Sequence, residues 1–315
     1  MTDRSRPAQQ SPQPHAPFDR AAVRRHRDRA AAGLDGHDFL FREVADRLAD
    51  RLSDVTRRFP RALDLGCHGG EVAEVIAGRG GVETLIQCDL SPAMSRRAGG
   101  NGNPTLCGDE EALPFGAAAF DLVMSNLSLH WVNDLPGALA QIRHCLRPDG
   151  LFLAALLAGD TLAELRGSLI EAELALTDGA SPRVSPIADM RDLAGLLQRA
   201  GFALPVVDSD TITVSYADPF RLMRDLRGMG ETNAVTARQR GFAARGLFLE
   251  AASRYRERYG DADGRVRATF QVVYLTAWTP HESQQKPLRP GSARARLADA
   301  LGAEERPAGE KTAPK

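Results

Sequence analysis

The chain has 315 residues, which is enough for one large domain or two small ones. Apolar residues make up 43% and charged residues 26%, so a hydrophobic core can form and disorder throughout the chain is excluded. The sequence contains no run of about 18 apolar residues, which excludes a membrane-spanning helix. A formal net charge of -1 argues against a nucleic-acid binder that depends on an overall positive field.

Residues 1–17 are polar and contain several prolines. They lack the apolar segment of a secretory signal and fit poorly the arginine-rich, amphipathic pattern of a mitochondrial presequence. The four cysteines form no C-x-x-C pair, which excludes zinc-knuckle and thioredoxin-like sites and is typical of a reducing compartment. We therefore predict a disordered leader and a cytoplasmic location.

Residues 18–60 are predicted to form a helical N-terminal extension. Within it, Phe41, Val44 and Leu48 recur at helical spacing, which predicts a helix over residues 39–59.

Residues 61–160 alternate between short apolar runs and helical segments. The predicted strands are residues 62–65, 84–88, 105–107, 120–125 and 151–158. The predicted helices are residues 71–77, a short segment that carries Met94, and residues 135–145, and the Arg-Pro-Asp-Gly sequence at 147–150 predicts a turn. Such alternation is typical of a doubly wound α/β sheet with mainly parallel strands.

Residues 161–280 continue the sheet and add helices that we expect to cover the substrate. The predicted helices are residues 161–176, 189–200, 219–227 and 247–258, and the predicted strands are 211–214 and 269–278. Residues 281–315 are rich in proline, glycine, alanine and charge, which predicts a disordered tail with a short helix at 293–301.

Acidic residues and glycines follow three successive predicted strands. Asp64 and a glycine-rich loop follow the first strand, Asp89 ends the second, and Asp109 and Glu110 end the third. Because ligands bind at the carboxyl ends of strands in an open α/β sheet, these residues indicate a nucleotide site. The glycines let the backbone approach the ligand, the following helix offers free N–H donors, and Asp89 can accept both ribose hydroxyls.

Two kinds of nucleotide site compete for this pattern. The loop Gly66-Cys67-His68-Gly69-Gly70 lacks the G-x-G-x-x-G spacing of a NAD site and fits the D-x-G-x-G-x-G form better. Residues 62–158 resemble the S-adenosylmethionine-binding core of class I methyltransferases. The matching segments are Leu63-Asp64-Leu65-Gly66-Cys67 with Gly69-Gly70, Cys88-Asp89-Leu90-Ser91, Glu111-Ala112-Leu113-Pro114-Phe115, Phe120-Asp121-Leu122-Val123 and Leu146-Arg147-Pro148-Asp149-Gly150.

The resemblance implies S-adenosylmethionine as the cofactor and a seven-stranded Rossmann-like sheet. The cofactor site that it implies comprises Asp64, Gly66, His68, Gly70, Asp89, Leu90, Met94, Asp109, Glu110 and Asn126. The loop glycines approach the methionine end, and Asp89 holds the ribose. Asp109 and Glu110 flank the adenine, and Asn126 faces the methyl group.

His68 departs from the family pattern, because it stands where the middle glycine of the loop is expected. Two roles are open for it. The side chain either contacts the carboxylate of the cofactor or is a tolerated surface substitution.

A narrower resemblance covers most of the chain and concerns two related groups. One is the malonyl-acyl-carrier-protein methyltransferase of biotin synthesis, and the other is the methyltransferase-like assembly factor of respiratory complex I, an arginine hydroxylase that acts on a complex I subunit. The arginine-rich start and residues 128–136, SLHWVNDLP, are more similar to the assembly factor. The segments that carry the resemblance are Phe18-Asp19-Arg20-Ala21 to Ala30, Ser125 to Val132, and Leu222 to Asn233.

Four further residues are candidates for chemistry or substrate binding. His130 is the candidate general base because it follows the fourth strand near the expected methyl position, and its alternative role is that of a hydrogen-bonded histidine at a helix start. Trp131 either walls the substrate pocket or anchors the next helix. Arg224 and Arg227 share one helix face, where they contact a substrate carboxylate or peptide, or form surface ion pairs.

The arginines at positions 24, 25, 27 and 29 indicate a solvated helix face in preference to a grip on an acidic substrate. His26 and Asp28 match the H-x-D part of an iron-binding triad. Residues two apart on a helix point to different faces, so we predict no metal site.

We therefore predict an α/β fold with a helical N-terminal extension and a helical insertion before the last strand. The predicted function is that of a class I methyltransferase-family enzyme of the complex I assembly factor type, acting on a protein partner. Three alternatives remain open: methyl transfer, including transfer to an acyl-carrier substrate; arginine hydroxylation, in which S-adenosylmethionine has another role; and a non-catalytic assembly module.

Overall fold

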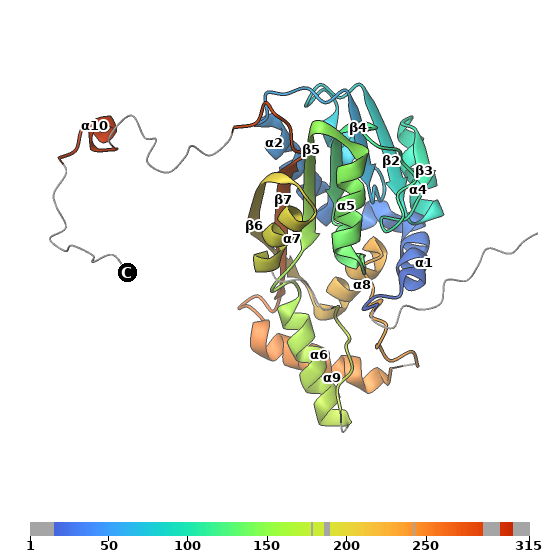
Figure 1. Ribbon diagram of the computed structural model, residues 1–315. Helices are drawn as coiled ribbons and strands as arrows, with labels where there is room; N and C mark the ends of the chain where they lie inside the picture. The colour runs from blue at the N-terminus through green and yellow to red at the C-terminus, as the bar shows by residue number, and fades with distance from the viewer. Residues whose placement is uncertain (1–15, 178, 186–189, 242, 286–296, 305–315) are drawn as a thin grey trace, which may run out of the picture. The chain divides into compact units, whose positions relative to one another are not determined.

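A computed structural model describes residues 16–177, 179–185, 190–241, 243–285 and 297–304. The chain divides into two units, Met1–His281 and Glu282–Lys315. The first unit contains the sheet and the helices that surround it (Figure 1). In the described part of the second unit, α10 spans Leu297–Leu301, and the rest of the helix predicted at 293–301 lies outside the described residues.

The N-terminal extension folds as helices that pack on the sheet. Helix α1 (Arg20–Ala30) begins at Asp19, whose side chain accepts a hydrogen bond from the Ala22 N–H. It continues into the 3-10 helix η1 (Ala31–Gly36), and α2 (Phe39–Ser53) follows. Most of the predicted leader lies outside the described residues, but its last two residues, 16 and 17, accept hydrogen bonds from Thr236.

Helix α2 is shorter than the predicted helix over residues 39–59, because it ends at Ser53. Phe59 is nevertheless buried, and its N–H donates to the Gly80 carbonyl at 2.7 Å. The apolar spacing continued past the helix because the following loop also contributes side chains to the core.

The sheet has seven strands in the order β3-β2-β1-β4-β5-β7-β6. Strands β1 to β5 are parallel to one another, whereas β7 pairs antiparallel with both β5 and β6. The strand bounds are β1 Arg61–Leu65, β2 Thr84–Asp89, β3 Thr105–Cys107, β4 Phe120–Asn126, β5 Leu146–Leu157, β6 Ala203–Tyr216 and β7 Val266–Trp278. The predicted seven-stranded sheet is confirmed. Because β1 lies between β2 and β4, the order in which successive strands are added to the sheet reverses there, which creates the crevice where ligands bind in such folds.

Helices cover both faces of this sheet. The cluster of buried side chains on one face includes Phe41 of α2, and the cluster on the other face includes Leu139 of α5 and Leu197 of α7. The remaining helix bounds are α3 Glu71–Ile76, α4 Pro92–Ala98, η2 Gly99–Asn101, η3 Leu129–Trp131, α5 Leu135–Cys145, α6 Ala163–Leu176, α7 Met190–Arg199, α8 Pro219–Met229 and α9 Arg245–Tyr259. Burial on both faces explains the unbroken apolar run in β5.

Two strands differ from their predicted limits. Strand β6 is far longer than the predicted 211–214, because its hydrogen-bonded ladder with β7 holds it over most of its length. As an edge strand it carries polar residues such as Asp208, so the apolar pattern covered only part of it. Strand β5 begins at Leu146, so the predicted turn at 147–150 lies inside the strand. Asp149 has a φ of +62°, and the register between β4 and β5 shifts at this point, so the turn residues produce an irregularity in the strand.

Helices α6 and α9 pack against each other at one end of the sheet, with α8 beside α9 (Figure 1). Helices α8 and α9 form the predicted helical insertion before the last strand. None of the helices in the described ranges is long and apolar enough to cross a membrane.

Candidate functional site

The loop after β1 requires glycine at its first position. Gly66 has a φ of +74°, and a Cβ atom built on it would lie 2.1 Å from Ser128 Oγ. Its N–H donates to the Cys88 carbonyl at 2.7 Å, which ties the loop to β2. Gly70 has a φ of +98° and is the N-cap residue of α3. The loop therefore lies against the end of β4 with no space for a side chain at position 66.

His68 is fully buried, so its predicted role as a surface substitution is wrong. The ring stacks on Phe41 with 4.1 Å between ring centroids, and Nε2 lies 3.0 Å from the Asn126 carbonyl oxygen. Burial, together with the charge of Arg27, lowers the pKa of His68 to about 4, so the ring is neutral near pH 7. The contact with the carbonyl assigns the ring proton to Nε2, which leaves Nδ1 as an acceptor.

Asp89 lies at the end of β2, as predicted, and both of its oxygens accept hydrogen bonds. The backbone N–H of Ser91 donates to Oδ1 at 2.7 Å, and the backbone N–H of His68 donates to Oδ2 at 3.1 Å. The neighbouring Leu90 and Met94 are buried, Leu90 beside Trp131 and Met94 in the core. The carboxylate of Asp89 is thereby held in a fixed orientation.

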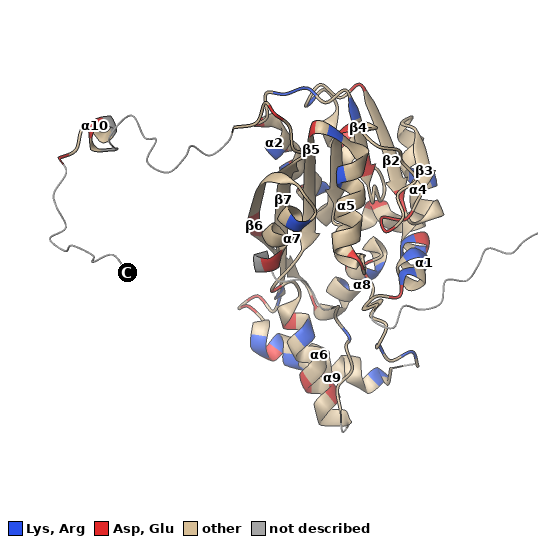
Figure 2. Cartoon of the chain, viewed as in Figure 1, with Lys and Arg blue, Asp and Glu red and all other residues tan. Residues whose placement is uncertain are grey.

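Arg27 of α1 is fully buried at the same place, so the predicted solvated helix face is wrong for this residue. Its Nη1 lies 3.4 Å from Asp89 Oδ2 and 3.3 Å from Glu110 Oε1, and its Nη2 donates to Ser128 Oγ at 2.9 Å. The two carboxylates explain the burial, because a buried guanidinium requires charged partners. Figure 2 shows that α1 is rich in basic residues, and the contacts with Asp89 and Glu110 place Arg27 on the side of the helix that faces the sheet.

Glu110 is also fully buried and has two arginine partners, Arg20 and Arg27. Burial alone would raise the pKa of Glu110, but the two guanidinium groups and Ser128 lower it to about 2. Asp109 pairs with Arg20 at 2.6 Å and is partly exposed. Glu110 is therefore ionised, and both carboxylates after β3 are in contact with the N-terminal helix.

Several buried polar atoms at this end of the sheet have no hydrogen-bond partner within the described part of the chain. Asp64 is fully buried, and burial, then the charges of Glu71 and Asp89, raise its pKa. Asn126 donates from Nδ2 to the Phe41 carbonyl at 2.8 Å. The atoms without partners are both carboxylate oxygens of Asp64, Arg27 Nε, His68 Nδ1, Asn126 Oδ1, His130 Nδ1 and Glu231 Oε1. Buried polar atoms normally have partners, so this group indicates a polar ligand.

His130 lies in η3 and contacts a carboxylate that the sequence did not single out. Its Nε2 lies 3.0 Å from Glu231 Oε2, and Trp131 Nε1 donates to the same oxygen at 2.8 Å. Trp131 also meets Phe18 edge to face, with 5.3 Å between ring centroids. Burial would raise the pKa of Glu231, but His130 and Arg27 hold it below its ordinary value.

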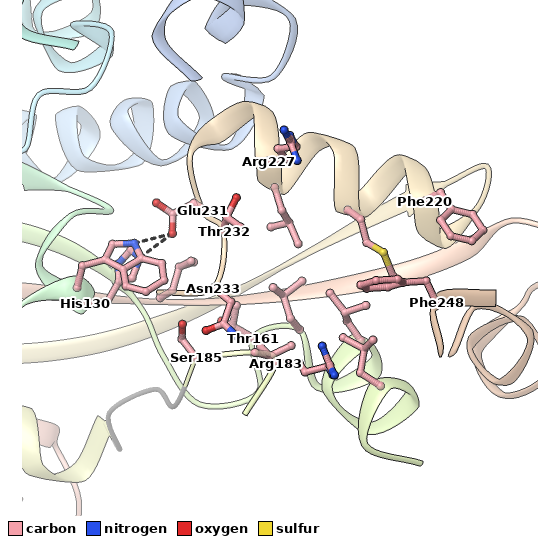
Figure 3. A pocket seen from close by; sticks show the side chains of 18 of the residues that line it. His130, Thr161, Arg183, Ser185, Phe220, Arg227, Glu231, Thr232, Asn233 and Phe248 are labelled. Carbon is pink, nitrogen blue, oxygen red and sulfur yellow. Dashed lines mark hydrogen bonds and ion pairs between the residues drawn. The ribbon is translucent and has the colours of Figure 1, made fainter. Parts of the chain in front are cut away.

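A cavity of about 750 Å³ adjoins His130, Trp131 and Glu231. Figure 3 shows His130 and Glu231 at one end of its lining and Phe220 and Phe248 at the other. Most of the lining is apolar, and α6, α8 and α9 contribute side chains such as Leu165, Met223 and Phe248. A cavity with an apolar body and a few convergent polar groups is typical of a substrate site.

The two predicted substrate arginines differ in position. Arg227 lines the cavity and is exposed, whereas Arg224 is exposed and not part of the lining. His26 and Asp28 face separate partners, because His26 Nδ1 lies 3.0 Å from the Thr232 carbonyl and Asp28 accepts from Ser91 Oγ at 2.6 Å. No group of three or more His, Cys, Asp or Glu suited to a metal ion occurs among the described residues.

Sequence reasoning missed Arg20, Arg27, Ser128 and Glu231 as site residues. Arg27 and Glu231 are distant in the sequence from their partners, since Arg27 is 62 positions from Asp89 and Glu231 is 100 from Trp131. The available signal for Glu231 was an acidic residue directly after Gly230, which ends α8 with a φ of +85°.

Comparison with known proteins gives relatives over almost the whole chain. The family described as "Methyltransferase domain" matches residues 63–154. The zebrafish (Danio rerio) protein named arginine-hydroxylase NDUFAF5, mitochondrial, is 46% identical over 90% of this chain and 88% of its own length. The malonyl-[acyl-carrier protein] O-methyltransferase of Methylovorus sp. is 36% identical over 84% of this chain and 90% of its own length.

A solved structure shares the fold. Phosphoethanolamine N-methyltransferase 2 of Haemonchus contortus, in complex with S-adenosyl-L-methionine, superposes with a TM-score of 0.53 and 15% identity. The match covers 82% of this chain and 60% of that chain. At this identity the likeness concerns the fold alone.

Proposed function

The chain belongs to the methyltransferase family that contains the NDUFAF5 arginine hydroxylases and the malonyl-[acyl-carrier protein] O-methyltransferases, and from this membership we propose that it is a protein-arginine hydroxylase that acts in complex I assembly. It is an enzyme of the S-adenosylmethionine-dependent class I methyltransferase family. The observation that carries the proposal is the identity of 46% with an NDUFAF5 protein over 90% of the chain, against 36% for the malonyl-[acyl-carrier protein] enzyme.

The residues at the carboxyl ends of the strands fit S-adenosylmethionine, which supplies a methyl group on a positively charged sulfur when it is bound. We assign the ribose to Asp89 and the adenine to the side of Asp109 and Glu110. The buried donors and acceptors without partners support a polar ligand beside the loop. Arg27 contacts both Asp89 and Glu110, so it lies beside the positions assigned to the ribose and the adenine.

A binding measurement tests this assignment without any turnover. We expect Asp89→Asn to weaken S-adenosylhomocysteine binding by tenfold or more in calorimetry. The reason is that the variant loses a hydrogen bond to a charged group, which contributes about 1.5–3 kcal/mol to binding. The matched control is Asp46→Asn, which makes the same change at an exposed position of α2. Equal affinities of the Asp89 variant and the wild type would exclude Asp89 as a cofactor residue.

We propose that His130 accepts a proton from the reacting group. Glu231 Oε2 fixes the ring from the Nε2 side, at 3.0 Å, so the neutral ring has its acceptor at Nδ1. Nδ1 has no partner within the described residues. The pair therefore has the arrangement of an oriented base next to a substrate cavity.

The proposed substrate is an arginine in a protein partner, in the cytoplasm as predicted. Hydroxylation replaces a C–H bond by a C–OH bond. With O2 as the oxygen source, one oxygen atom enters the product and the other leaves as water, with two electrons from an external reductant and two protons from solvent. Methyl transfer to a carboxylate, the alternative reaction, needs no electrons and yields a methyl ester.

The test compares cells that contain the chain with cells from which it has been deleted. Mass spectrometry of isolated complex I should find an arginine that is heavier by one oxygen atom in the first and unmodified in the second. A complementing His130→Gln chain should leave the arginine unmodified, and a Glu250→Gln chain should restore it.

Methyl-labelled S-adenosylmethionine distinguishes the alternatives. Label that enters an acyl-carrier fraction as an alkali-labile ester, with no oxidised arginine, would replace the proposal by carboxyl methylation. The exposed Arg227 and Arg245 at the cavity are the structural feature that favours a carboxylate substrate. Complex I assembly that is rescued by a chain inactive in both assays would indicate an assembly module.

A further inference from the structure

The substrate cavity has a charged end and an apolar body. His130 and Glu231 lie at one end of its lining, and Phe220 and Phe248 lie at the other (Figure 3). Further apolar side chains of the lining include Leu165 and Met223. An occupant that fits this shape carries one polar or charged group on an otherwise apolar segment. The identity of the group depends on the charge at the polar end.

Glu231 supplies a buried negative charge at that end. Its side chain is 6% exposed, and the hydrogen bonds that it accepts from His130 and Trp131 both go to Oε2. The second oxygen, Oε1, has no partner within the described part of the chain. Neighbouring charges keep its pKa below the ordinary value, so the carboxylate is ionised near pH 7.

The basic residues of the lining do not cancel this charge. Arg183 is already paired with Glu173 at 2.5 Å. Arg227 and Arg245 are exposed, so water and salt screen them, whereas the buried carboxylate acts in a medium of lower dielectric constant. The polar end of the cavity is therefore electronegative and favours a positively charged ligand group.

We propose that Glu231 is the specificity residue that binds the guanidinium group of the substrate arginine, with the apolar body of the cavity holding the segment that flanks it. This inference rests on the proposed arginine hydroxylation and adds a residue to it. A guanidinium has five N–H donors and can contact the carboxylate while His130 remains bonded to Oε2. The arginine is thereby placed beside His130.

The test is a titration that requires no turnover. The probes are acetyl-Leu-Arg-Leu-amide and acetyl-Leu-citrulline-Leu-amide, which differ by the guanidinium charge. In calorimetry, wild-type protein should bind the arginine peptide about tenfold to a hundredfold more tightly than the citrulline peptide. Glu231→Gln, which keeps an acceptor oxygen for Trp131, should bind the two peptides equally, and Glu231→Asp should recover part of the difference.

Glu250→Gln is the matched control, because it makes the same change on α9 outside the lining, and it should discriminate as the wild type does. Wild-type protein that binds both peptides equally, or binds neither at millimolar concentration, overturns the inference. A Glu231→Gln variant that is folded by circular dichroism and still discriminates also overturns it. Discrimination that depends on Glu231 in a protein that oxidises no arginine in cells would uphold the binding site and refute the proposed reaction.

Discussion

At the scale of single residues, His68 and Glu71 near the end of β1 have pKa values that are shifted in opposite directions, so their contributions to stability depend on pH in opposite ways. His68 is buried and neutral, with a pKa of about 4, lowered by burial and Arg27. Glu71 has a pKa raised to about 7, chiefly by burial. The contribution of His68 to stability is complete above its unfolded pKa of about 6.5 and is lost as the pH falls through 4. That of Glu71 is complete below about 4.5 and is lost as the pH rises through 7.

The first prediction concerns the pH dependence of His68. Asn tolerates the left-handed backbone at this position and does not titrate, so His68→Asn removes the ionisation with little backbone strain. The wild type should lose up to about 3 kcal/mol of its free energy of unfolding relative to the variant between pH 7 and pH 4, because only the wild type has the shifted histidine. Urea unfolding at a series of pH values measures it. A pH-independent difference would show that His68 titrates normally.

The second prediction concerns Gly66. Gly66→Ala should lower the free energy of unfolding by about 2–4 kcal/mol, because a Cβ would overlap Ser128 Oγ and the φ of +74° strains any side chain. Gly100→Ala is the control, since a Cβ there meets nothing within 4 Å. Gly66→Ala should cost less in a Ser128→Gly background, with Ser128→Gly alone as the reference because Ser128 also bonds Arg27 and Glu110. Urea unfolding of these proteins measures both costs, and an equal cost of Gly66→Ala in the two backgrounds would remove Ser128 as the cause.

At the scale of elements, α1 completes the candidate cofactor site. The helix begins at Asp19, and its inward face carries Arg20 and Arg27 to carboxylates at the ends of β2 and β3. A helix with a strongly basic sequence thus docks through buried ion pairs in addition to apolar side chains such as Val23. A buried ion pair contributes little net stability, because both charges lose their hydration. Removing one member is nevertheless strongly destabilising, because the other charge stays buried without a partner.

The third prediction follows from this docking. Arg27→Met should lower the free energy of unfolding by about 3–5 kcal/mol in the absence of ligand, because Asp89 and Glu110 lose a buried partner. Arg25→Met changes an exposed arginine of the same helix and should stay within about 0.5 kcal/mol of the wild type. Both values come from urea unfolding. A small effect of Arg27→Met would mean that α1 does not hold the two carboxylates.

At the scale of the whole molecule, stability resides in Met1–His281. Within the described part of the chain, the buried clusters on both sheet faces and the smaller cluster around Trp131 contain no residue after Ala277. The central strands are covered on both sides, and the cavity lies where α6, α8 and α9 extend beyond the sheet. His130, which follows β4, and Glu231, which follows α8, both line this cavity.

The fourth prediction concerns the second unit. A chain that ends at residue 285 should unfold within about 2 °C of the full chain, because its buried clusters are intact. A chain that ends at residue 270 should not fold, since it lacks Val272, Tyr274 and Leu275 of β7. Differential scanning calorimetry measures both. A large drop in the unfolding temperature of the chain that ends at residue 285 would assign a structural role to residues 286–315.

The predictable part of this protein is the part that local pattern encodes. The apolar run of β5, the helix Leu135–Cys145 and the acidic residues after three strands are properties of neighbouring residues, and each follows from periodicity or turn chemistry. The edge strand β6 and the early end of α2 were not predictable in this way, because a ladder partner and a loop contribution to the core decided them.

The amino-acid sequence by itself determined the fold class, the glycine loop and the order of the carboxylates, because backbone conformation and apolar spacing act over a few residues. The tertiary structure decided which charges are buried together. Arg27 meets Asp89, and Glu231 meets His130, across 62 and 101 positions of the chain. Such contacts depend on how whole elements pack, and their electrostatic consequences depend on the exclusion of water that this packing produces.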